Sequence, residues 1–413
     1  MRISDILVEK VVRLIWIVAA IMASALSVEA QERASSPEPG MAVTAPLLIP
    51  AAPVANRIGR PFADTQSDDV APRQSSPVIN GADKSIPHIA LLLPLASKTF
   101  GKVGDALKQG FIAGAEADGK NASPYRIYTA DDEGASLAAQ YRRAVSEGAY
   151  AIIGGMTRDG ANIMVRESRV LPTLALNAPA TSIDNDLPDR FVYVSLSLDL
   201  EAVLVARMAA DDGLHSIAMV VANDPLSKRV QESFEREWLR LGGEIATQIA
   251  FGSDSGDTTR VATAMEKVAG RATAVFLAAG PKAARFVRPY LPAGMPAFAT
   301  SQSIDPYAGS VANLDLDGVR FLEMPWFAQR DHPAVIAYAK PAQSMAVEYE
   351  RLYALGIDAW RLGQLIVKSE NMRSLLPLDG VTGRITLDGH QLNRALPSLE
   401  MRDGKSQLYR RNE

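Results

Sequence analysis

The stretch His88-Ile-Ala-Leu-Leu-Leu-Pro-Leu95 decides the fold class of this chain. It is a short apolar run, and a segment with helical periodicity follows it from about Val103 to Ala117. Short apolar runs that alternate with helical segments are typical of βαβ units and of a mostly parallel sheet. The stretch therefore predicts an α/β fold.

The alternation continues in two successive series. The first series contains the predicted strands 89–95, 126–129, 151–153 and 173–176, and the second contains 217–221, 245–251, 274–277 and 297–300. We therefore expect two open, mostly parallel, doubly wound lobes with a cleft between them. Residues 87–413 are expected to form this two-lobed domain.

The C-terminal part of the chain is expected to return to the first lobe. A helical region at 345–368 is too long to belong to the second lobe alone. The first lobe is therefore expected to contain about 87–195 and about 316–380. The second lobe is expected to contain about 196–315 together with the C-terminal segments, where two Asp-Gly pairs predict tight hairpin turns.

The residues before 87 are expected to lie outside the fold. Three basic residues precede an apolar stretch at 14–26, and Val28-Glu29-Ala30 fits a small-x-small cleavage site, so residues 1–30 are predicted to be a secretory signal peptide. A retained membrane anchor is the alternative, but a helix of that length rises only about 20 Å, less than the roughly 30 Å hydrocarbon core. Residues 31–86 contain eight prolines and one aromatic residue, which predicts a disordered linker. We expect a periplasmic protein with no stable membrane insertion after cleavage.

The composition excludes several classes of protein. The 413 residues include no cysteine, so a zinc ribbon, an iron-sulfur cluster, a thiol nucleophile and a lipid-modified cysteine are excluded, and we do not expect a lipoprotein. Lys and Arg number 43 against 47 Asp and Glu, a formal net charge of -4. A nucleic-acid partner is not expected, because phosphate binding needs a basic surface.

No arrangement of residues in the sequence indicates catalysis. The four histidines stand apart from one another at 88, 215, 332 and 390. Gly252-Ser-Asp-Ser-Gly256 lacks the central serine that a nucleophile elbow requires, and no phosphate-binding glycine loop is present. We therefore expect no catalytic residue, no metal site and no cofactor.

The candidate ligand-binding residues lie in the loops that follow the predicted strands, because ligands of open α/β sheets bind at the carboxyl ends of strands. These candidates are Thr157, Arg158, Asn177, Thr181, Asn223, Ser301 and Gln302. Two glycines at 154–155 would let backbone amides approach an anion at a helix start. A plain strand-to-helix turn explains the two glycines equally well.

Several fragments spread over residues 88 to about 390 resemble a known family. Besides the stretch 88–95, they are Gly110-Phe-Ile-Ala-Gly114, Leu174-Ala-Leu-Asn177, Ala299-Thr-Ser-Gln302, Asp315-Leu-Asp-Gly-Val-Arg-Phe321, Met324-Pro-Trp326 and Leu355-Gly-Ile-Asp-Ala-Trp-Arg-Leu362. Together they are similar to the C-terminal domain of the LppC-like penicillin-binding-protein activators. The resemblance implies the fold of type 1 periplasmic binding proteins of the branched-chain amino-acid (leucine) binding kind.

The same resemblance implies a partner and no catalysis. Members of the family are expected to stimulate a bifunctional penicillin-binding protein, a peptidoglycan synthase, by contact. This chain differs from typical members because it has no cysteine for a lipid anchor and because a proline-rich segment stands where many members have helical repeats. Both differences weaken the expectation of synthase activation but not that of the fold.

Three functions are therefore considered. The first is a non-enzymatic periplasmic regulator of peptidoglycan synthesis, with Trp326 and Phe327 as candidate partner-binding residues, unless they form a buried strand end. The second is a solute-binding protein for a small polar or anionic ligand such as an amino acid. An amine-binding carboxylate is doubtful because the loop after 300 has no acid before Asp305, and Arg158 fits either an anion or a salt bridge across the cleft. The third and weakest is an exported hydrolase.

Overall fold

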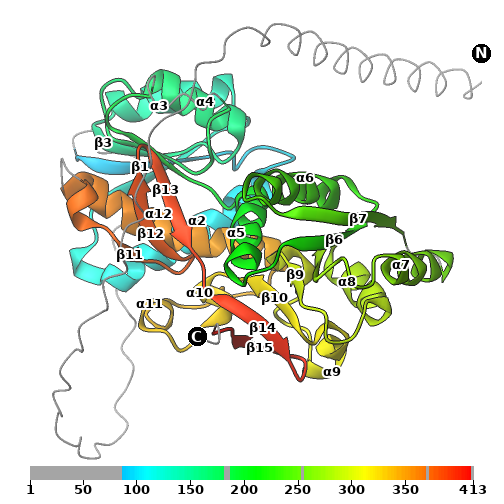
Figure 1. The fold of residues 1–413 in the computed structure, drawn as a ribbon. Coiled ribbons are helices and arrows are strands. Elements are labelled where there is room, and N and C mark those ends of the chain that lie inside the picture. Colours follow the sequence, from blue (N-terminus) through cyan, green and yellow to red (C-terminus); the bar gives the residue numbers. More distant parts are fainter. Residues whose placement is uncertain (1–85, 181–186, 253–254, 369–371, 411–413) are drawn as a thin grey trace, which may run out of the picture. The chain divides into compact units, whose positions relative to one another are not determined.

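The computed structural model describes residues 86–180, 187–252, 255–368 and 372–410 (Figure 1). The predicted signal peptide and, apart from Ile86, the predicted linker lie outside the described residues. Within this part of the chain, none of the helices combines the length and the apolar character that a membrane crossing requires.

The first lobe is built on a sheet with the strand order β11-β12-β13-β5-β4-β3-β1-β2. Its strands are β1 (His88–Leu93), β2 (Tyr125–Thr129), β3 (Ala149–Gly154), β4 (Thr173–Ala175), β5 (Phe191–Val194), β11 (Leu378–Asp379), β12 (Arg384–Asp388) and β13 (Gln391–Ala395). The strands from β2 to β13 in this order are parallel, and β12 and β11 are antiparallel additions. Every residue of β1 is buried, as expected for a central strand covered on both faces.

Helices cover both faces of the first sheet. They are α2 (Gly101–Asp118) with η1 (Gly119–Asn121), α3 (Ala135–Ser146), α4 (Arg158–Glu167) and α12 (Val347–Lys368) with η6 (Met372–Leu375). α12 packs along α2, and a Cβ atom on Gly110 would collide with the backbone carbonyl oxygen of Tyr353. Gly356 has the same relation to the carbonyl oxygen of Leu107. The two helix backbones therefore approach as closely as they do only because glycines stand at the contact.

The second lobe is built on a sheet with the strand order β15-β14-β10-β9-β8-β6-β7. Its strands are β6 (Ser216–Ala222), β7 (Glu244–Phe251), β8 (Ala274–Ala278), β9 (Ala297–Ala299), β10 (Val319–Leu322), β14 (Ser398–Arg402) and β15 (Lys405–Leu408). The strands from β7 to β10 are parallel, and the hairpin β14–β15 adds to β10 in antiparallel fashion. The longer helices here are α5 (Leu198–Asp211), α6 (Pro225–Arg240), α7 (Ser255–Lys267) and α8 (Pro281–Val287).

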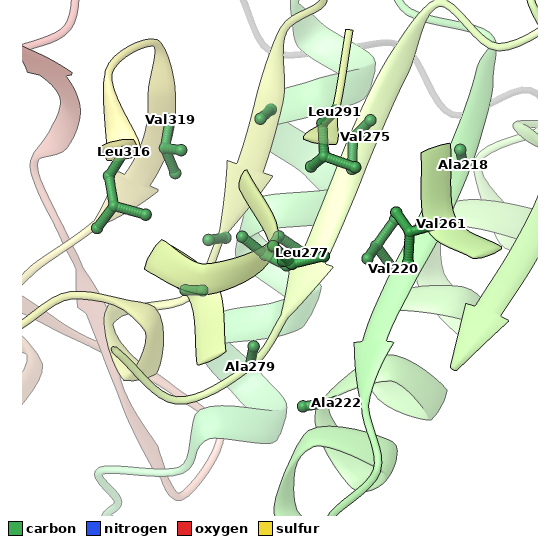
Figure 2. Packing of buried hydrophobic residues seen from close by; sticks show 14 of the residues in the cluster. Ala218, Val220, Ala222, Val261, Val275, Leu277, Ala279, Leu291, Leu316 and Val319 are labelled. Atoms are coloured by element: carbon green, nitrogen blue, oxygen red, sulfur yellow. The ribbon is translucent and has the colours of Figure 1, made fainter. Parts of the chain in front are cut away.

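Alternating strand residues form the core of the second lobe (Figure 2). Val220 on β6 lies beside Val261 from α7, and Leu277 on β8 belongs to the same cluster; all three are fully buried. Residues of α5 and α6 cover the opposite face of the same sheet. α6 begins at Pro225, and the Asp224 carboxylate accepts a hydrogen bond from the Ser227 N–H at 2.9 Å, as an N-cap does. The two lobes confirm the predicted fold class.

Short helical segments complete the second lobe and the connection out of it. They are η3 (Arg288–Tyr290), η4 (Ser301–Ser303), α9 (Ser310–Asn313), η5 (Leu314–Leu316), α10 (Pro325–Ala328) and α11 (Pro333–Ile336). In Figure 1 the yellow segment with α10 and α11 leads from β10 toward the orange helix α12 of the first lobe.

The predicted boundaries of the lobes need correction. β10 lies inside the segment 316–380 that was assigned to the first lobe, but its backbone pairs with β9 and β14 of the second sheet. Conversely, β12 and β13 come from the C-terminal segments assigned to the second lobe, and β13 pairs with β5 of the first sheet. Within the described residues the chain therefore passes between the sheets after β5, after β10 and after β13.

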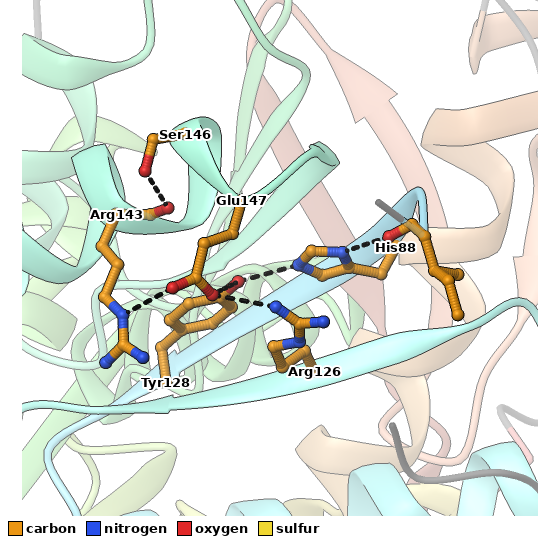
Figure 3. A network of polar contacts seen from close by, with 7 residues as sticks. His88, Arg126, Tyr128, Arg143, Ser146 and Glu147 are labelled. Carbon is orange, nitrogen blue, oxygen red and sulfur yellow. Dashed lines mark hydrogen bonds and ion pairs between the residues drawn. The ribbon is translucent and has the colours of Figure 1, made fainter. Parts of the chain in front are cut away.

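A polar network holds the start of β1 (Figure 3). His88 is fully buried, with Nδ1 2.9 Å from the Ile86 carbonyl oxygen and Nε2 2.8 Å from the Tyr128 hydroxyl. The Glu147 carboxylate accepts hydrogen bonds from Arg126 and Arg143, each at 2.9 Å. Burial lowers the pKa of His88, so the neutral imidazole is favoured, with Nδ1–H donating to Ile86.

Candidate functional site

A cavity of about 550 Å³ lies between elements of the two lobes. It is formed by α5, the start of α6, the β8–α8 and β9–η4 connections, the start of α12 and the end of β13. Its apolar wall consists of Leu196, Leu198, Leu226, Pro281, Ile304, Met324, Val347, Leu352 and Leu396. A largely apolar cavity of this size with a few polar groups is the usual form of a small-molecule site.

Glu201 and Ser301 form one of the polar pairs in this wall. Glu201 on α5 is 6% exposed, and its carboxylate accepts hydrogen bonds from the Ser301 N–H and from the Ser301 hydroxyl, the latter at 3.0 Å. Burial raises the pKa of Glu201 to about 7, although the charge of Arg351 acts against that rise. This carboxyl group therefore changes its charge near neutral pH.

Arg351 and Glu323 form the second polar pair. The Arg351 guanidinium donates from Nη1 and Nη2 to the two oxygens of Glu323, at 2.6 and 2.7 Å. Such a two-point contact is the strong form of an arginine–carboxylate interaction. Because Arg351 lies in the first turns of α12 and Glu323 follows β10, the pair joins the first lobe to the second sheet.

Arg394 on β13 completes the charged groups of the wall. Its Nε donates to the Ser195 carbonyl oxygen at 3.1 Å, and its Nη1 donates to the Thr382 carbonyl oxygen at 2.9 Å. Burial lowers the pKa of Arg394, and the charges of Glu201 and other acids oppose the shift. Among the described residues its hydrogen bonds go to backbone carbonyls, not to a carboxylate.

Two predicted ligand-binding residues line the cavity. Ser301 and Gln302 form the start of η4 directly after β9. The Gln302 Oε1 atom is buried and has no hydrogen-bond partner within the described ranges. A buried acceptor without a donor costs free energy, so Gln302 Oε1 is an unfavourable feature of this wall.

The predicted residues of the first-lobe loops do not line the cavity. Thr157 caps α4: its N–H and hydroxyl donate to Glu133 at 2.8 and 3.1 Å, and its hydroxyl oxygen accepts from Gly160. The Asn177 amide donates to the Met156 carbonyl oxygen at 2.8 Å. The hydrogen bonds of both side chains therefore stabilise the loops in which they lie.

Arg158 forms a salt bridge between the lobes, which is the alternative to anion binding. Its Nη2 lies 3.8 Å from Asp199 Oδ2 on α5, and Arg229 donates to the other oxygen of Asp199 at 2.9 Å. Arg158 is therefore part of an exposed salt bridge between the lobes. Asn223 is exposed and outside the cavity wall, and Thr181 lies outside the described residues.

The two glycines before Thr157 serve the turn. Gly155 has φ +68°, and a Cβ there would come within 2.8 Å of the Met164 side chain and 3.0 Å of the Ala161 nitrogen. Sterics therefore explain this glycine without an anion.

Trp326 and Phe327, the candidate partner-binding residues, are buried, as the alternative to partner binding expects. They are 4% and 8% exposed and belong to an interior cluster with Tyr353 and Ile357 of α12. The Trp326 indole N–H donates to Glu350 at 2.8 Å. The segment reads as apolar because it packs under the connection to α12.

Sequence analysis missed Glu201, Arg351 and Arg394. They come from two helices and a strand near the passages between the lobes, not from loops that follow parallel strands. The sequence holds a signal for Glu201, because its neighbours Leu200, Ala202 and Val203 are all apolar. A single charge on an otherwise apolar helix face indicates a buried polar contact.

The comparisons with known proteins agree with this fold. A family model described as "LppC putative lipoprotein" matches residues 70–404. The penicillin-binding protein activator LpoA of Escherichia coli K12 is 26% identical over 301 residues, which cover 63% of this chain and 44% of LpoA. The chain thus spans about half the length of the curated relatives it matches.

Solved structures share the two-lobed architecture. The C-domain of LpoA from Haemophilus influenzae, a regulator of PBP1A, aligns with a TM-score of 0.61 and 21% identity, covering 78% of this chain and 99% of that domain. A Chromobacterium violaceum protein, "a putative branched-chain amino acid ABC transporter", aligns with a TM-score of 0.64 and 32% identity, covering 77% of this chain and all of that one. Since the family model covers most of the residues, the chain belongs to the LppC family.

Proposed function

We propose that this protein is a non-enzymatic periplasmic regulator of peptidoglycan synthesis that binds a bifunctional penicillin-binding protein. The observation that carries the proposal is the near-complete match to one unit of a regulator: the chain covers 99% of the LpoA C-domain but 60% of the full-length LpoA of the same species. The E. coli relative bears the name of an activator.

The chemistry of the cavity supports binding and not turnover. The Ser301 hydroxyl donates a hydrogen bond to the Glu201 carboxylate, which also accepts a hydrogen bond from the Ser301 N–H. Neither group is therefore directed at an open reaction centre. Arg351 is engaged by Glu323 at both ends of its guanidinium. These pairs stabilise a fixed wall.

The proposed location is the periplasm, reached through the predicted signal peptide at 1–30. The matching family is described as a lipoprotein, which conflicts with the expectation, drawn from the absence of cysteine, that this chain carries no lipid. Fractionation of cells and the intact mass of the recovered protein test both points.

A glycan-polymerisation assay tests the regulator proposal. The protein is added to a purified bifunctional synthase from the same organism, and consumption of the lipid-linked precursor is followed with time. A faster rate and direct binding are expected, because the relatives are named as activators. A two-lobed solute-binding protein at the same concentration is the control. An unchanged rate together with no binding would contradict the proposal.

The cavity favours a second candidate function, the binding of a small solute. Its walls come from both lobes, as in proteins that hold a ligand between two α/β domains. A ligand that binds only the folded protein raises its melting temperature. A panel of amino acids and small organic anions, amines and alcohols is expected to contain such a ligand, and a panel with no shift would contradict this function.

A further inference from the structure

We propose that the cavity between the lobes binds a small molecule with an apolar body and one carboxylate, and that the carboxylate pairs with Arg394. The inference rests on the second candidate function, solute binding, and is independent of the synthase. The site is distinct from the loops after β3 and β4, because neither Thr157 nor Asn177 lines it.

The preference for an anion follows from the hydrogen-bond partners that the charged side chains of the cavity wall already have. Both terminal nitrogens of the Arg351 guanidinium donate hydrogen bonds to Glu323, and both carboxylate oxygens of Glu201 accept hydrogen bonds from Ser301. Arg394 has five N–H donors, and its hydrogen bonds to the Ser195 and Thr382 carbonyls use two of them. A carboxylate is the partner that fits the remaining fork of an arginine.

The preference for an apolar body follows from the rest of the wall. The passage after β5 contributes Leu196 and Leu198, and the passage after β13 contributes Leu396. Helix α12 adds Leu352, and the second lobe adds Leu226 and Ile304. Removing apolar ligand surface from water is favourable, so this wall favours a hydrocarbon chain over a sugar or a phosphate.

Acidic groups around the cavity define how binding depends on pH. Glu201 on α5 contacts Ser301 from η4 and lies near the charges of Arg351 and Glu323. The charges of Glu201, Glu323 and the buried Asp358 act on Arg394. Glu348 and Asp305 are two further acids in the cavity wall. Burial raises the pKa of Glu201 to about 7. Its negative charge at pH 8 opposes a second carboxylate at Arg394, and its protonation at pH 6 removes that opposition. A carboxylate is therefore expected to bind more tightly at pH 6 than at pH 8.

Calorimetric titration with three probes of one chain length tests the proposal: hexanoate, hexylamine and 1-hexanol. Hexanoate is expected to bind at least about tenfold more tightly than the other two, because a charged hydrogen-bonded contact is worth that much. Arg394→Gln is expected to reduce the hexanoate affinity about tenfold or more. Arg384→Gln removes the same charge from an exposed position on the neighbouring strand β12 and is the matched control.

A second variant covers the case in which Arg394→Gln does not fold. Leu226→Trp fills the cavity from the second lobe and is expected to abolish hexanoate binding, while circular dichroism verifies the fold. Equal binding of the three probes, or an unchanged affinity of a folded Arg394→Gln, would overturn the ligand class but leave solute binding in place. Absence of binding by any probe and by the wider panel would overturn both.

Discussion

Replacing Glu201 by glutamine is expected to change how the stability of the protein depends on pH. In the folded protein burial raises the pKa of Glu201 to about 7, whereas the ordinary value is 4.5. A raised carboxyl pKa means that the folded state prefers the protonated form. The contribution of Glu201 is therefore fully favourable below pH 4.5 and is lost as the pH rises through about 7.

The magnitude follows from the two pKa values. One pKa unit corresponds to about 1.4 kcal/mol, so the charged carboxylate costs the folded state about 3 kcal/mol at pH 8 and less than about 1 kcal/mol at pH 5. Glutamine keeps one acceptor for the Ser301 N–H and one donor for the Ser301 hydroxyl. Glu201→Gln is therefore expected to match the wild type near pH 5 and to exceed its free energy of unfolding by about 2 to 3 kcal/mol at pH 8.

Urea unfolding at pH 5, 6, 7 and 8 measures this difference. Glu348→Gln is the matched control, because it removes a carboxylate from an exposed position of the same cavity wall and is expected to keep the pH dependence of the wild type. A stability difference between Glu201→Gln and the wild type that stays constant over this pH range would refute the reasoning.

Three further predictions concern the core. Gly110→Ala is expected to destabilise the protein by about 1 to 3 kcal/mol, because its Cβ meets backbone across the helix contact, whereas Gly256→Ala meets nothing within 4 Å and should be neutral or slightly stabilising in thermal unfolding. His88 is expected to titrate below 6.5 by NMR, so its neutral form contributes stability above pH 6.5 that is lost as the pH falls through its lowered pKa. Trp326→Phe removes the indole donor of the Glu350 carboxylate and is expected to lower the free energy of unfolding by about 1 to 3 kcal/mol without weakening synthase binding. Weaker synthase binding at an unchanged free energy of unfolding would instead support a role of Trp326 in partner binding.

The fold class was predictable because the central strands are continuous apolar runs in the sequence. The stretch 88–95 is buried along all of β1, and such continuous apolar runs are what a parallel sheet covered on both faces requires. Which sheet receives a strand is a different question. β10 and β13 are short, and the sheet that each one joins depends on its neighbours: β10 pairs with β9, and β13 pairs with β5, which is far away in the sequence. Local pattern therefore does not determine where the chain passes between the lobes.

The candidate site was predictable only in part, for the same reason. Ser301 and Gln302 follow a parallel strand, so the rule about carboxyl ends of strands found them. Arg394 lies within a strand, and its importance depends on the cavity that forms beside β13. The sequence left two interpretations of Trp326 open, because an aromatic residue in a predicted loop has the same sequence pattern whether it binds a partner or packs inside.

The polar pairs of the cavity also bear on how the two lobes are held. Arg351 belongs to a helix packed on the first sheet, and its partner Glu323 follows a strand of the second sheet. Removing one member of a buried, two-point ion pair is far more costly than the pair is stabilising, because it leaves an uncompensated charge. The pair therefore resists sliding of α12 along the end of β10. Arg351, Glu201 and Arg394 line the same cavity, so a molecule bound there would lie beside the contact that joins the two lobes.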